Sequence, residues 1–137
     1  MSSERHGKPL VVAQVLLWIA AAAALASAVF AIAQVSEATA STKVVETWRM
    51  VGLATFAALF ASLARRPRGR RTLWAVVIAN KLLLTVAGAV YTVQGGVDGA
   101  TDILVFDGGL TLLLVAAFAL AHTGSRAQAA DDPEPAR

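Results

Sequence analysis

Arg65-Arg66-Pro67-Arg68-Gly69-Arg70-Arg71 lies almost at the centre of the 137-residue sequence, with long apolar runs on both sides. Five of these seven residues are arginines, and the proline and the glycine break helices. Loops on the cytoplasmic side of a membrane carry an excess of Lys and Arg. The stretch, here called the arginine loop (residues 65–71), therefore predicts two membrane hairpins joined at the cytoplasmic surface.

The arginine loop has two interpretations, which stay open at this stage. It acts as a topology signal alone, or its side chains also bind anionic lipid headgroups. The candidate lipid contacts are Arg65, Arg66, Arg68, Arg70 and Arg71.

The composition favours a membrane protein. Apolar residues make up 57% of the chain and charged residues 15%, against about 25% charged residues in a soluble domain. The apolar residues cluster in long runs, which is typical of membrane spans. The net charge of +3 is concentrated in one loop between apolar segments, so we expect no nucleic-acid partner.

The residues that most often hold metals and cofactors are scarce. There is no cysteine, which excludes disulfides, thiolate metal sites and cysteine nucleophiles. The two histidines, His6 and His122, lie outside the apolar runs or at their edge. A metal or haem between helices needs ligands inside the bundle, so we expect neither a metal nor a cofactor.

The apolar runs predict four spans, at about residues 10–35, 44–64, 72–93 and 102–121. The first run is much longer than the apolar region of a signal peptide, about 7–15 residues, so we expect it to remain as a helix. Residues 1–9 form a short cytoplasmic tail, residues 10–122 the transmembrane domain, and residues 123–137 a polar, disordered cytoplasmic tail. The fold class is therefore an all-α, multi-pass protein of the cell membrane. Its four transmembrane helices form an antiparallel up-down bundle, and both termini are cytoplasmic.

Two charged residues share one depth. The uninterrupted apolar parts of the second and fourth spans, residues 50–64 and 108–121, are too short to cross a hydrocarbon core of ~30 Å. Arg49 and Asp107 are thus drawn into the outer part of the membrane, ~24 Å and ~22 Å from the cytoplasmic edge. We predict an ion pair between them, with Thr111, one turn away, supplying a hydrogen bond. The alternatives are a pair that also lines a ligand site, or side chains that reach the outer headgroups separately.

Lys81 lies ten residues past Arg71, or ~15 Å deep, near the middle of the membrane. It shares a helical face with Thr85, Gly88 and Thr92, a polar and small stripe that favours the bundle interior over lipid. Three interpretations remain open. The lysine extends toward the cytoplasm, it faces a cavity that binds an anionic or carbonyl-bearing ligand, or it joins Arg49 and Asp107.

The third span reads Ala79-Asn80-Lys81-Leu82-Leu83-Leu84-Thr85-Val86-Ala87-Gly88. This lysine-bearing segment and the four-span layout resemble small bacterial four-helix membrane proteins of the DoxX-like kind. The resemblance implies an accessory subunit of the bacterial inner membrane, beside a redox or respiratory partner. It carries over no catalytic residue.

Three classes of function follow. The favoured class is a non-catalytic accessory or scaffold subunit, whose partners are the lipid bilayer and a membrane protein or a second copy of this chain. The alternative is a binder or transporter of an anionic or lipid-like ligand. A membrane enzyme acting on lipid or quinone has the least support, because Asp107 alone would have to serve as acid or base. The ligand-binding candidates are Lys81, Arg49, Asp107, Thr85 and Thr111.

Overall fold

The computed structural model describes residues 3–130, with side chains described for residues 8–122. These residues form four helices and no strand: α1 (Ser3–Glu37), α2 (Lys43–Arg65), α3 (Arg71–Gln94) and α4 (Ala100–Ala130). Each helix has an apolar segment long enough to cross a membrane. The four segments are Lys8–Glu37, Lys43–Arg65, Arg71–Gln94 and Ala100–His122. The prediction of an all-α chain with four such helices is confirmed.

The outer helices extend beyond the predicted spans. Helix α1 begins at Ser3, inside the predicted amino-terminal tail, and α4 continues to Ala130, past the predicted end at residue 121. An α-helix satisfies its own backbone hydrogen bonds, so it can continue into polar sequence beyond an apolar segment. The prediction of disorder from residue 123 is therefore wrong for residues 123–130. Residues 131–137 lie outside the described part of the chain.

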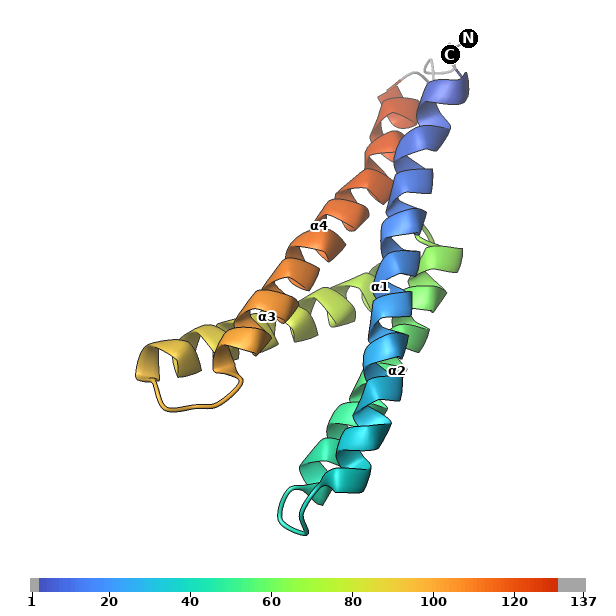
Figure 1. The fold of residues 1–137 in the computed structure, drawn as a ribbon. Coiled ribbons are helices and arrows are strands. Elements are labelled where there is room, and N and C mark those ends of the chain that lie inside the picture. The colour runs from blue at the N-terminus through green and yellow to red at the C-terminus, as the bar shows by residue number, and fades with distance from the viewer. Residues whose placement is uncertain (1–2, 131–137) are drawn as a thin grey trace, which may run out of the picture.

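The helices form two antiparallel hairpins, α1 with α2 and α3 with α4 (Figure 1). The hairpins meet at the end that carries the arginine loop, where α1 also packs against α4. Away from this joint they diverge, and the two remaining connections lie far apart in Figure 1. The arrangement is a V in which α2 and α3 contact each other much less than the two helices within each hairpin do.

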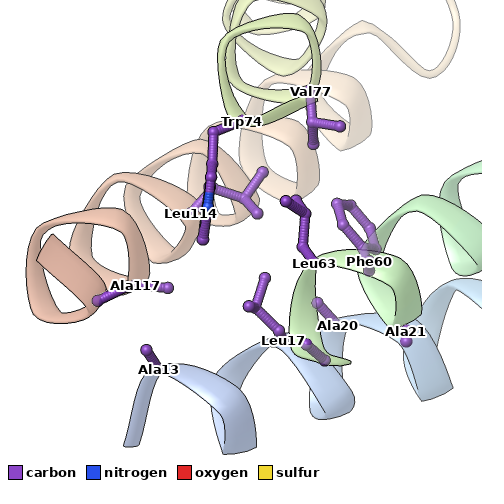
Figure 2. Close-up of a cluster of buried hydrophobic side chains, with 12 residues drawn as sticks. Ala13, Leu17, Ala20, Ala21, Phe60, Leu63, Trp74, Val77, Leu114 and Ala117 are labelled. Carbon is purple, nitrogen blue, oxygen red and sulfur yellow. The ribbon is translucent and has the colours of Figure 1, made fainter. Parts of the chain in front are cut away.

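The buried core lies at this joint and draws side chains from all four helices (Figure 2). Alanines on α1 let the neighbouring helices approach closely, and the largest side chains fill the space between the hairpins. The buried residues of this cluster are Ala13, Leu17, Ala20, Ala21, Phe60, Leu63, Ala64, Trp74, Val77, Leu114, Ala117 and Ala121.

Side-chain contacts near the arginine loop fix the ends of the helices that meet there. The Trp74 indole Nε1 donates to the Pro67 carbonyl at 2.8 Å, and the Trp74 ring meets Phe118 edge-on with centroids 5.5 Å apart. Within the first hairpin, Gln14 Nε2 of α1 donates to the Ala64 carbonyl of α2 at 3.1 Å. The arginine loop is thus packed against the core at Pro67, although its arginines are exposed.

The connection between α3 and α4 is rich in glycine. Gly95, Gly96 and Gly99 have φ values of 73°, 74° and 77°. Residues with a Cβ rarely adopt this left-handed region. Helix α3 therefore ends at Gln94, as the glycine-rich turn in the sequence predicts.

Gly88 sets the distance between α3 and α4. A Cβ built on it would lie 2.7 Å from the Leu104 backbone nitrogen and 3.1 Å from Ile103 Cγ2. We expect Gly88→Ala to lower the free energy of unfolding by about 1–3 kcal/mol, because overpacking forces the backbones apart. Thermal unfolding in detergent measures this change.

Gly109→Ala is the matched control. Nothing lies within 4 Å of a Cβ at Gly109, so this change should be neutral or stabilise the helix by up to about 1 kcal/mol. Equal effects of the two substitutions would contradict a close contact at Gly88.

Candidate functional site

Three side chains lie one heptad outward from the buried joint. Residues seven apart share a helix face, so a core residue indicates which side chain faces the same space two turns further along. The core residues and their outward partners are Leu63 and Phe56 on α2, Trp74 and Lys81 on α3, and Leu114 and Asp107 on α4. The three partners meet where the V begins to open.

Lys81 and Asp107 form an ion pair at this point. Lys81 Nζ lies 2.6 Å from Asp107 Oδ1, and the side chains are only 9% and 17% exposed. The ammonium also lies 4.3 Å from the centroid of the Phe56 ring, within the range of a cation–π contact. Lys81 therefore bonds to α4 within its own hairpin and contacts α2 of the other hairpin.

Two threonines support the helices on either side of the pair. Thr85 Oγ1 donates to the Lys81 carbonyl at 2.8 Å, and Thr111 Oγ1 donates to the Asp107 carbonyl at 2.7 Å. The two hydroxyl oxygens are 3.3 Å apart across the α3–α4 interface. Thr111 thus bonds to the backbone of Asp107 rather than to its carboxylate. Thr85 and Thr111, both named as ligand-binding candidates from the sequence, lie next to the Lys81–Asp107 pair. Their hydroxyl groups bond to the helix backbones at the α3–α4 interface.

Arg49 lies elsewhere. Its guanidinium pairs with Glu46 on the same helix at 2.5 Å and donates to the Gln34 side-chain oxygen on α1. The predicted Arg49–Asp107 pair is therefore wrong, although the sequence did place both charges within the helices. Equal depth does not make residues neighbours, and the hairpins have diverged at the level of Arg49. The Glu46 partner was missed, despite its spacing of three residues from Arg49, which allows contact on one helix face.

The five arginines of the loop differ in their contacts. Arg68 Nε donates to the Ala121 carbonyl of α4 at 3.0 Å, so this side chain ties the loop to the second hairpin. Arg65 ends α2, and Arg71 begins α3. All five side chains are exposed, which leaves the others available to solvent or to a membrane surface.

Two open depressions lie on α3, and Lys81 lines neither. One of about 480 Å³ lies at the arginine loop, and one of about 390 Å³ lies near the other end of the helix. Within residues 8–122, no three His, Cys, Asp or Glu side chains gather as metal ligands would. The ion pair is thus a neutral, largely buried unit rather than a charged group at the base of a cavity.

Fold and site together define an all-helical protein with four helices long and apolar enough to cross a membrane and a lysine–aspartate pair between them. No family model, curated protein or solved structure matches the chain.

Proposed function

We propose that this chain is a multi-pass membrane protein that acts as a non-catalytic accessory or scaffold subunit for another membrane protein. The observation that carries the proposal is the V. The two hairpins diverge away from the arginine loop (Figure 1), and α2 and α3 contact each other far less than the helices within each hairpin do. A helix of another polypeptide fits between such hairpins, because helices associate in lipid through close packing.

The proposed topology follows from the lysines and arginines. Five arginines lie in the central loop, whereas Lys43 begins α2 at the opposite end. The positive-inside rule then places the arginine loop and both termini in the cytoplasm, with four spans running up and down through the bilayer. The likeness to DoxX-like proteins of the bacterial inner membrane agrees with this topology, and remains a proposal of the same kind.

The ligand-binding alternative has less support. It depends on excess positive charge within the membrane, whereas Lys81 is neutralised by Asp107 and Arg49 by Glu46. Each ion pair therefore has no net charge left to attract an anion. The described helices expose many large apolar side chains, which suit a packed helix better than a small anion.

A photocrosslinking experiment tests the scaffold role. Leu84 lies seven residues from the buried Val77 and so faces the opening of the V, while Leu83 lies about 100° around the helix and is 69% exposed. With benzoylphenylalanine at position 84, we expect a covalent adduct with a distinct membrane polypeptide in native membranes. Position 83 is the matched control, and lipid adducts should dominate there.

The proposal fails if position 84 gives lipid adducts alone, or if both positions capture the same set of proteins. The first result would mean that lipid fills the V, and the second that the contacts are unselective.

A further inference from the structure

We propose that the start of α3 forms a binding site for one anionic phospholipid. The headgroup phosphate is held by Arg70 and Arg71, and the acyl chains lie along Leu73 and Val76. The inference goes beyond the scaffold role and depends only on the proposed position of the arginine loop at the cytoplasmic surface.

The site is a depression with a polar end and an apolar end. It has a volume of about 480 Å³ and is lined by Gly69, Arg70, Arg71, Thr72, Leu73 and Val76. Its polar end is at the loop, and its apolar end extends onto the membrane-spanning part of α3. Nothing lies within 4 Å of the position that a Cβ on Gly69 would occupy, so the polar end is open. The order of groups along the depression matches that of a phospholipid, with its phosphate at the surface and its chains below.

The two arginines are free to bind a ligand. Both side chains are exposed, and neither has an ion pair or a side-chain hydrogen bond within residues 8–122. An arginine fork binds phosphate oxygens through two parallel hydrogen bonds, which makes arginine well suited to a phosphodiester. The adjacent Thr72 hydroxyl is a further donor on the same rim.

The apolar end favours a lipid over a free anion. Val76 is 58% exposed, and Leu73 is half-buried against the core. An exposed valine about one and a half turns from two arginines offers no hydrogen bond to a soluble phosphate, but it offers contact area to an acyl chain. The shared chemistry is a phosphate group, and the source that fits the whole depression is an anionic lipid of the cytoplasmic leaflet.

The other end of the arginine loop supplies the matched control. Arg65 and Arg66 carry the same charge and are exposed, but they lie at the end of α2 and do not line the depression. A general attraction between a basic loop and an anionic surface would use both pairs equally. A built site uses only Arg70 and Arg71.

The experiment measures phosphatidylglycerol retained on the full-length protein by native mass spectrometry. The protein is taken from nanodiscs of phosphatidylcholine and phosphatidylglycerol in equal parts. We expect Arg70→Gln with Arg71→Gln to weaken retention about 30-fold, from the usual contribution of two basic residues at an anionic surface. Arg65→Gln with Arg66→Gln should weaken it by no more than about threefold, because charges outside the contact are screened. Equal losses in the two double variants would overturn the site.

A second variant tests the apolar end without changing the charge. Val76→Trp fills the depression and should reduce phosphatidylglycerol retention while both arginines remain. Unchanged retention would overturn the placement of the acyl chains, and displacement of the lipid by inorganic phosphate at equal concentration would overturn the lipid as ligand.

Because the chain has no cysteine, labelling of Gly69→Cys against Ser41→Cys in sealed vesicles reports on which side of the membrane the arginine loop lies. This labelling distinguishes a wrong topology from the absence of the lipid site. The unfolding temperature of each variant shows whether that variant is folded.

Discussion

Lys81→Met is expected to lower the free energy of unfolding by about 3–5 kcal/mol, because it leaves the Asp107 carboxylate without its cation in a largely buried position. Asp107→Leu should cost a similar amount, since it leaves the ammonium with only the Phe56 ring. Thermal unfolding in detergent, followed by circular dichroism, measures both losses.

The double variant, Lys81→Met with Asp107→Leu, should be much more stable than either single variant, and within about 1 kcal/mol of the natural protein. Replacing both members of a buried ion pair by apolar residues removes the desolvation penalty together with the attraction. A double variant as unstable as the worse single variant would show that the two side chains are not coupled.

The second ion pair in the described helices serves as the control. Arg49 is 48% exposed and pairs with Glu46 on its own helix. Arg49→Met should therefore cost at most about 1 kcal/mol, the usual range for exposed pairs. A loss as large as that of Lys81→Met would mean that the exposed pair contributes as much as the buried one.

Trp74→Ala is expected to destabilise the joint between the hairpins by about 3–5 kcal/mol. The ring is 1% exposed, contacts Phe118 edge-on, and is among the largest fully buried side chains of residues 8–122. Its removal leaves a cavity in the cluster where α3 meets the other three helices. The unfolding temperature in detergent should fall accordingly.

Trp74→Phe separates the ring from its hydrogen bond. This variant keeps most of the volume but leaves the Pro67 carbonyl without the indole donor, at a cost of about 1–3 kcal/mol. Trp48→Ala is the control, because Trp48 is 76% exposed and the change should stay within about 0.5 kcal/mol. Equal losses at Trp74 and Trp48 would contradict the structural role of the joint.

Much of the secondary structure could be predicted from composition and spacing. The second and third spans were expected at residues 44–64 and 72–93, and the helices are Lys43–Arg65 and Arg71–Gln94. Long apolar runs and helix-breaking residues act locally, so neighbouring sequence contains the information. The length of the carboxyl-terminal helix was underestimated, because a helix can continue from an apolar segment into the polar sequence that follows it.

The candidate site could be predicted only in part. Lys81, Asp107, Thr85 and Thr111 were all named from the sequence, and the structure brings these four together. Arg49 was assigned to the same cluster and lies apart from it. Phe56 was not named, because an aromatic residue in an apolar span has no distinguishing signal until its neighbours are known.

By itself, the sequence of this protein determined the number of helices long enough and apolar enough to cross a membrane, and their approximate places in the chain, because hydropathy and the helical rise per residue are one-dimensional properties. The tertiary structure alone decided which charges pair. The packing of the hairpins sets the direction in which each helix face points, and that direction joins Asp107 to Lys81 on the adjacent helix rather than to Arg49. It also decided that the hairpins meet at the arginine loop, because the large and small side chains of the joint fit together only in three dimensions.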